Sequence, residues 1–249
     1  MKNIFKIIAL LLILIILSCK EDAEKPKVSY NKIDKNVTEQ KQDTTKIVVA
    51  GLPIQFEGTN YLIYPIGNLN TIDIVDSKYD SSRGNATTNF NVANNMENEI
   101  TGYLLNLKFQ KTDSDSLISL TKKPMMIQTV DYLKSVAVRT KQQILVYLIE
   151  DSDTNEDNKL DSSDIKSLYL SDISGAKFTK ISTDVQEVLD WKLIESRNRI
   201  YFRAVEDTNK NGKFDKNDKL HYNYVNLLDK EWKAVEFMQP QEVTSPPNK

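Results

Sequence analysis

The chain has 249 residues, of which 40% are hydrophobic, and a formal net charge of −2. This composition excludes a multispanning membrane protein, and it lacks the basic excess typical of nucleic-acid-binding proteins, so we expect no nucleic-acid partner. The single cysteine, Cys19, excludes an intrachain disulfide.

The chain begins with a positively charged segment, followed by an apolar segment that ends at a cysteine. Two lysines precede a continuous apolar run over residues 7–17, and the small Ser18 stands before Cys19. The run is shorter than the roughly 20 residues that a spanning helix needs. The pattern resembles a bacterial lipoprotein signal with its lipobox. This resemblance implies a signal peptide over residues 1–18 and a lipid on the Cys19 thiol. It also implies an outer membrane lipoprotein, on the periplasmic face or at the cell surface.

Residues 19–45 are predicted to form a flexible linker between the lipid and the folded domain. The stretch is mostly charged and polar, so it cannot bury enough apolar surface to fold. Lys20, Glu21 and Asp22 resemble the surface-export tag of lipoproteins in some Gram-negative bacteria; a merely polar start to the linker is the alternative.

Residues 46–240 are predicted to form one β domain, followed by a disordered tail over residues 241–249. Short runs of β-branched and aromatic residues alternate with Gly, Pro and polar residues, and no long segment has helical periodicity. Residues 76–99 read as a long polar loop. Strands are predicted at residues 47–50, 61–64, 103–109, 117–120, 125–130, 133–138, 144–149, 168–170, 177–181, 188–193, 200–205, 220–225 and 232–237.

Asp153–Asp164, here called loop one, has the oxygen spacing of an EF-hand-type calcium loop. Position seven supplies a backbone carbonyl in such loops, so the lysine side chain there can point away. A short helical turn after position nine or twelve is also expected. The predicted ligands are Asp153, Asn155, Asp157, Lys159, Asp161 and Asp164.

Asp207–Asp218, here called loop two, repeats this pattern. The two loops share residues at positions one, two, three, seven, nine and twelve. One such loop is weak evidence, since Asp and Asn favour turns for local reasons; two loops in one register predict two calcium ions. A pair of solvated hairpin turns is the alternative. The predicted ligands of loop two are Asp207, Asn209, Asn211, Lys213, Asp215 and Asp218.

The two loops differ in charge and in backbone freedom. Loop one has more carboxylates and fewer lysines, which favours cation binding. Loop two has Gly212 at the sharp-turn position six, where loop one has Asn158, a residue that tolerates a left-handed backbone. Both loops end in Asp instead of Glu, so we expect modest affinity, suited to calcium at roughly millimolar concentration.

The sequence around the loops is also repeated, which indicates an array of antiparallel strands. Residues 168–175 and 181–183 resemble a TolB-like β-propeller blade, and the likeness extends loosely over residues 130–238. The chain is too short for the usual minimum of four blades. We therefore predict an all-β antiparallel fold with propeller-like repeats, or alternatively a β-sandwich, with the calcium loops at hairpin tips. Without paired helices, a structural ion is expected instead of a sensor.

Other chemistry has little support in the sequence. The single histidine, His221, lies in an aromatic strand, and no nucleophile elbow is present. Trp191 and Trp232 are expected in the core. The first functional hypothesis is a lipid-anchored, calcium-stabilised binding or scaffold module with an unknown protein or glycan partner, leaning away from an enzyme. The alternative is a carbohydrate-active enzyme that uses paired carboxylates.

Overall fold

The structure is a computed structural model that describes residues 26–30, 46–70 and 92–238. The predicted signal peptide, Cys19 and the predicted C-terminal tail lie outside these ranges, as does segment 76–91 of the predicted polar loop. Within the described residues, no helix is both long enough and apolar enough to cross a membrane.

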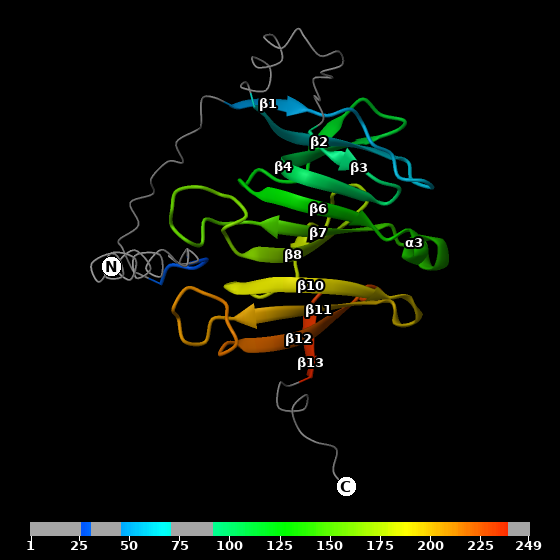
Figure 1. Cartoon of the computed structure of the whole chain (residues 1–249). Helices are drawn as coiled ribbons and strands as arrows, with labels where there is room; N and C mark the ends of the chain where they lie inside the picture. Colours follow the sequence, from blue (N-terminus) through cyan, green and yellow to red (C-terminus); the bar gives the residue numbers. More distant parts are fainter. Residues whose placement is uncertain (1–25, 31–45, 71–91, 239–249) are drawn as a thin grey trace, which may run out of the picture.

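The larger of two sheets is antiparallel and has nine strands (Figure 1). Its order is β1-β2-β4-β6-β7-β8-β9, with β3 and β5 paired to β4. The sequence predicts that the second strand ends before Pro65, because proline cannot donate a ladder hydrogen bond. In the structure β2 continues through Pro65, which lies opposite Leu107 of β4. The strands are β1 (Lys46–Ala50), β2 (Tyr61–Asn70), β3 (Asn94–Asn95), β4 (Glu99–Lys111), β5 (Leu117–Ser119), β6 (Met126–Tyr132), β7 (Ile144–Glu150), β8 (Lys166–Asp172) and β9 (Thr179–Lys180).

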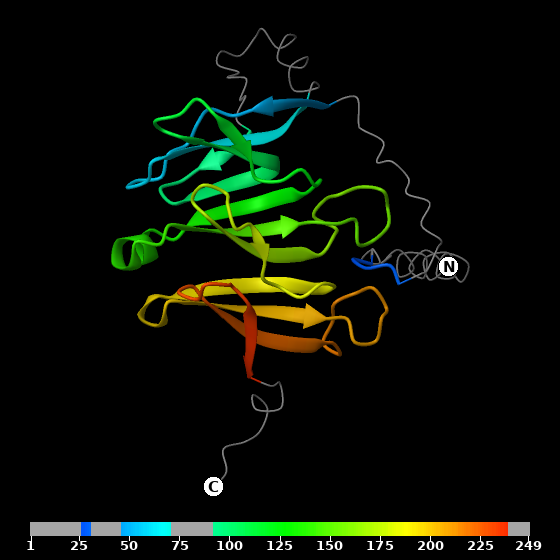
Figure 2. The same cartoon turned by 180° about the vertical axis from the view of Figure 1, so that it is seen from behind.

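The smaller sheet has four strands in the order β10-β11-β12-β13. They are β10 (Gln186–Ile194), β11 (Arg199–Glu206), β12 (Lys219–Asn226) and β13 (Ala234–Met238). Strand β10 lies beside β8 in both Figure 1 and Figure 2. No ladder joins these two strands in the described chain. Instead, Leu168 N–H donates to Ser182 Oγ at 3.1 Å and Lys166 N–H donates to Glu187 Oε2 at 2.8 Å. The Glu187 side chain thus links the two strands directly, whereas Ser182 lies in the connection that precedes β10.

Strand β7 contributes to both hydrophobic cores of the molecule. Its continuous apolar sequence suits a strand that is buried on both faces. The first core lies within the larger sheet and contains Leu145, Tyr147 and Ile149. The second contains Ile144 and Val146, together with buried side chains of β8, β10, β11 and β12. The second core therefore fastens the smaller sheet to one face of β7 and β8.

Each sheet contains the same unit of three strands with a helical turn in the first connection. The unit runs β6, α3 (Lys134–Thr140), β7, loop one and β8 in the larger sheet. In the smaller sheet it runs β10, η1 (Glu195–Arg197), β11, loop two and β12. The two helical turns touch, since Arg139 Nη2 donates to Asn198 Oδ1 at 2.6 Å. The repeat predicted from the sequence is thus visible as two matched meanders.

The prediction of a strand at residues 133–138 is wrong, because most of these residues belong to α3. Leu133 and Val136 are both buried, whereas Val138 is 68% exposed. This spacing of three places one helical face on the core, but in so short a segment it is hard to distinguish from strand alternation. The helix ends at Lys141, whose φ is 67° and whose N–H donates to Ala137 O.

The prediction of an all-β antiparallel fold is confirmed, and the two sheets fit the β-sandwich alternative. Both loops lie at hairpin tips, as predicted: loop one joins β7 to β8, and loop two joins β11 to β12. In the predicted polar loop, the described part contains β3 and the first residue of β4.

Candidate functional site

Loops one and two lie at the same end of the molecule, opposite α3 (Figures 1 and 2). This placement follows from the repeated unit, because β7 and β11 each run from a helical turn at one end to a loop at the other. The twelve predicted ligands are therefore gathered at one end, six in each loop.

The carboxylate at position one organises the first half of each loop. In loop one, Asp153 accepts hydrogen bonds of 3.2 and 2.9 Å from the backbone N–H groups at positions five and six. In loop two, Asp207 accepts the equivalent bonds at 3.1 and 2.6 Å. The same side chain thus folds the same turn in both loops.

Three further side chains in each loop make equivalent short-range bonds. The side chains at positions three, five and nine accept from the backbone N–H groups at positions five, seven and eleven. These distances are 2.9, 2.9 and 2.8 Å in loop one, and 2.9, 2.8 and 2.8 Å in loop two. Each is an Asx turn, the local bond that makes Asp and Asn common in turns. The side chains involved are Asn155, Asp157 and Asp161, and Asn209, Asn211 and Asp215.

The carboxylate at position twelve ties the end of each loop to its beginning. Asp164 accepts from the N–H groups at positions two and nine, at 2.7 and 3.0 Å. Asp218 accepts the same pair at 3.1 and 2.8 Å. Asp164 is fully buried, and this burial raises its pKa although the backbone donors act in the opposite direction. In place of a helix, one hydrogen-bonded turn spans positions nine to twelve in each loop.

The backbone is left-handed at positions four and six of both loops. At position six, φ is 63° for Asn158 and 80° for Gly212, in agreement with the choice of residues there. At position four, φ is 59° for Glu156 and 56° for Lys210. The sequence gives no signal at position four, because neither residue favours this conformation.

A threonine at position two closes each loop, a role that the sequence analysis missed. Thr154 Oγ1 accepts from Ile165 N–H at 2.9 Å, and Thr208 Oγ1 accepts from Lys219 N–H at 3.2 Å. The signal was available, since the threonine is shared by both loops. A hydroxyl that bonds a backbone group outside its own turn, however, cannot be inferred from spacing alone.

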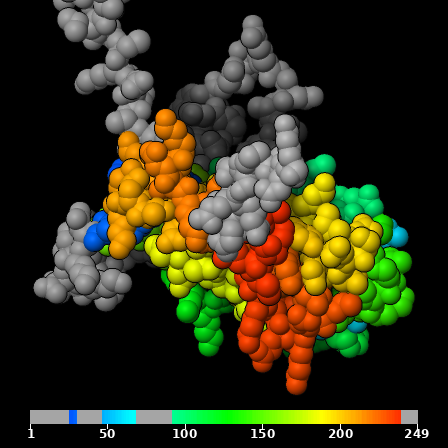
Figure 3. All heavy atoms as spheres, turned by 90° about the horizontal axis from the view of Figure 1, so that it is seen from below, coloured from blue at the N-terminus to red at the C-terminus, as the bar shows by residue number. Residues whose placement is uncertain are grey.

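Residues 26–30, here called the strap, lie between the two loops (Figures 1 and 2), and Figure 3 shows them against loop two. Lys27 N–H donates to Gly212 O at 2.6 Å, and Ser29 N–H donates to Thr154 O at 2.8 Å. Thr154 Oγ1 in turn donates to Lys27 O at 2.7 Å. Val28 is only 4% exposed. The strap falls within the predicted flexible linker, so for these five residues the structure differs from a free tether; the loops supply the contacts that the polar linker lacks.

A pocket of about 420 Å³ lies between the strap and the two loops. It is lined by strap residues, by positions three and five of loop one, and by positions four to six of loop two. Tyr30 forms part of its wall, and burial together with the nearby Asp207 carboxylate raises the pKa of its phenol to about 12. Asp157 is the one carboxylate in this lining, so the pocket does not hold the carboxylate pair of a glycosidase.

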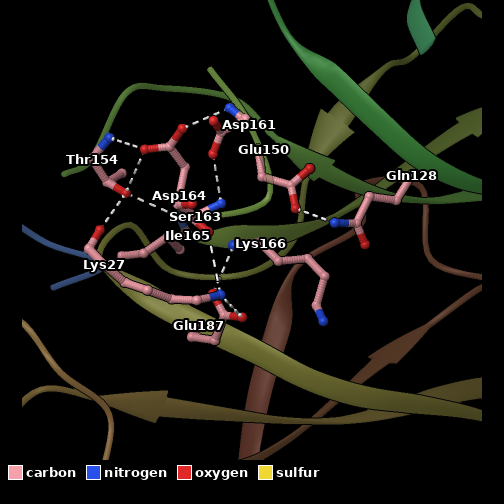
Figure 4. Close-up of polar contacts among 10 residues, drawn as sticks. All are labelled: Lys27, Gln128, Glu150, Thr154, Asp161, Ser163, Asp164, Ile165, Lys166 and Glu187. Carbon is pink, nitrogen blue, oxygen red and sulfur yellow. Dashed lines mark hydrogen bonds and ion pairs between the residues drawn. The ribbon is translucent and has the colours of Figure 1, made fainter. Parts of the chain in front are cut away.

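The Lys27 side chain fixes the strap to the base of loop one (Figure 4). Its Nζ lies 2.9 Å from Glu187 Oε1, at the start of β10, and 3.5 Å from Asp164 O. The other oxygen of Glu187 accepts from Lys166 N–H at 2.8 Å. One carboxylate therefore connects the strap, β8 and the smaller sheet.

Glu150, the last residue of β7, is a buried carboxyl just before loop one (Figure 4). It is 1% exposed, and its Oε1 accepts from Gln128 Nε2 at 2.5 Å. Its Oε2 has no partner among the described residues. Burial is the main cause that raises its pKa to about 8, and the nearby Glu187 acts in the same direction. Glu150 therefore carries a proton at neutral pH.

The remaining candidate residues have structural contacts. His221 lies in β12 as predicted, with Nε2 2.8 Å from Glu206 and Nδ1 3.1 Å from Glu236. Trp191 and Trp232 pack against the second core, in agreement with their expected role as core anchors.

The donor set of the two loops fits calcium. Carboxylate, amide and backbone carbonyl oxygens are the ligands that this hard cation prefers. Each carboxylate or amide oxygen that accepts one N–H retains capacity to accept or coordinate further. Over the described part of the chain, no three His, Cys, Asp or Glu side chains converge on one point as metal ligands. An EF-hand-type loop also uses Asn side-chain oxygens and a backbone carbonyl oxygen as ligands, so its site does not depend on three such side chains alone.

The residues of both loops thus form two geometrically equivalent sites, joined by the strap. No family model, curated protein or solved structure matches the chain.

Proposed function

We propose that this chain is a lipid-anchored, calcium-binding β-protein of the bacterial envelope. Each of the two loops binds one calcium ion, and the ions stabilise the folded β domain instead of switching its two sheets between conformations. The domain serves as a binding or scaffold module for a protein or glycan partner. The lipid on Cys19 attaches it to the membrane.

The observation that carries the proposal is the equivalence of the two loops. Five side chains in each loop bond the same backbone positions, and the left-handed residues occur at the same two positions. Simple hairpin turns need no such agreement over twelve residues. A shared requirement for oxygen atoms at fixed positions explains it.

Calorimetric calcium titration of the full-length chain in detergent tests the sites. We expect two ions per chain for the wild type, and one for Asp153→Ala or Asp207→Ala, because each substitution removes the position-one carboxylate of one loop. Asp113→Ala, which removes an exposed carboxylate outside both loops, is the matched control and should retain two ions. An unchanged stoichiometry in either loop variant would show that its loop is only a turn.

The structural role predicts that calcium raises the melting temperature. An ion that binds only the folded state stabilises it by about 2.7 kcal/mol per site at a hundredfold excess over Kd. Chelation should lower the melting temperature and increase hydrogen exchange around residues 150–170 and 205–222. A melting curve that does not respond to calcium would argue against this role.

The lipid anchor is tested separately, by metabolic labelling with a fatty-acid analogue. The wild type should be labelled and Cys19→Ala should not. Label that persists in Cys19→Ala would place the lipid elsewhere.

A further inference from the structure

We propose that the strap docks on the two loops only when calcium holds them in shape, and that docking places the loop end of the domain against the membrane. The inference rests on the proposed calcium sites and lipid anchor, and it adds a partner surface to them: the bilayer faces the loops.

The strap donates hydrogen bonds to backbone carbonyls of both loops, so its docking depends on the conformation of the loops. Its acceptors are the carbonyl at position six of loop two, Gly212, and the carbonyl at position two of loop one, Thr154. Both carbonyls belong to turns that the position-one and position-twelve carboxylates hold together. Without an ion, the carboxylates in each loop repel one another, and these turns loosen. Because binding is reciprocal, an ion that orders the loops promotes docking, and a docked strap raises calcium affinity.

Gly212 permits both the left-handed backbone of loop two and the close approach of the strap. A Cβ atom added at this residue would lie 2.4 Å from Val28 O and 2.8 Å from Pro26 Cβ. Loop one has Asn158 at the equivalent position with almost the same left-handed backbone. A side chain at position six is therefore compatible with the loop, and in loop two it is the strap that leaves no room for one.

Docking shortens the connection between the lipid and the domain. From Cys19 to Pro26 the chain spans at most about 25 Å when fully extended. Beyond the strap, the next residue that the structure describes is Lys46, at the start of β1. With the strap released, the chain from Cys19 to Lys46 can span at most about 90 Å when fully extended. A docked strap therefore keeps the loops near the bilayer and directs α3 away from it, whereas a released strap fixes neither distance nor orientation.

Hydrogen exchange of the full-length lipidated chain in phospholipid vesicles tests the coupling. In calcium, the amides of Lys27 and Ser29 should exchange at least about tenfold more slowly than after chelation. Gly212→Asn places in loop two the residue that loop one already has. It should keep calcium-dependent protection of both loops but lose that of the strap. Asn158→Gly, the reciprocal change in loop one, is the matched control and should behave like the wild type.

The orientation is measured by energy transfer from a single attached fluorophore to acceptor lipids. One probe is placed at Lys216→Cys in loop two and another at Val138→Cys in α3, both exposed positions. In calcium, transfer should be much stronger from residue 216 than from residue 138. Chelation or Gly212→Asn should remove this difference.

The outcomes separate the inference from the function on which it rests. If calcium protects the loops but leaves exchange of the strap unchanged, the coupling is refuted and the calcium sites stand. If neither the loops nor the strap responds, the calcium sites themselves fail. Equal transfer from both probes in calcium, with a protected strap, would overturn the proposed orientation.

Discussion

Replacing the buried Glu150 should change how the stability of the domain depends on pH. Burial raises the pKa of this carboxyl from 4.5 to about 8, so the folded state binds its proton more tightly than the unfolded state does. Between pH 4.5 and 8 the folded form holds the proton and the unfolded form releases it. The contribution of Glu150 to the free energy of unfolding therefore decreases as pH rises through this window, and is constant above it.

The size of the effect follows from the two pKa values. Their difference corresponds to at most about 5 kcal/mol of stability lost between pH 4.5 and pH 8. Glu150→Gln keeps the shape of the side chain and its acceptor for Gln128, but it cannot ionise. We therefore expect the variant to match the wild type near pH 4.5 and to be more stable at pH 8.5, by up to about 5 kcal/mol.

Urea unfolding of the full chain at pH 5, 7 and 8.5 measures this difference directly. Glu231→Gln removes a carboxylate that is 71% exposed and serves as the control, which should keep the pH profile of the wild type. Asp131, whose pKa burial raises to about 6, also titrates in this range. Its contribution to the stability is present in both proteins, so the difference between Glu150→Gln and the wild type isolates the effect of Glu150. A stability difference between Glu150→Gln and the wild type that is the same at all three pH values would refute the reasoning.

Two further substitutions test local contacts. Gly175→Ala should lower the free energy of unfolding by about 1–3 kcal/mol, because the residue has a φ of 80° and an added Cβ would lie 2.6 Å from the Phe109 ring; an unchanged urea midpoint would contradict this. Thr154→Val should cost about 1–3 kcal/mol by leaving the N–H of the buried Ile165 without its acceptor. It should cost more than Thr208→Val in the same assay, since the equivalent donor, Lys219, is exposed.

The sequence predicted the hairpin loops well because their signal is local and repeated. Asp and Asn at fixed positions bond backbone groups two to five residues away, so the spacing that marks a ligand set also marks the turn. Gly212 and Asn158 indicated the left-handed backbone at position six for the same reason. Strand positions followed from β-branched and aromatic runs bounded by turn residues.

What the sequence could not reveal depends on contacts between distant segments. Val28 is one apolar residue in a polar stretch, and its burial depends on two loops that lie more than a hundred residues further along the chain. The pKa of Glu150 likewise depends on β10 packing against β8, which brings Glu187 near. In α3 the segment was too short for its apolar period to be distinguished from that of a strand.

Because β7 belongs to both cores, the connection between β8 and β10 does not separate two independently folding halves. Cutting the chain there would expose Ile144 and Val146 on one fragment and their partners Ile200 and Phe202 on the other. Each fragment would then expose an apolar patch that is covered in the intact domain. Heat or denaturant should therefore unfold both sheets in one cooperative transition, and any circular permutation that preserves the fold must leave β7 uninterrupted.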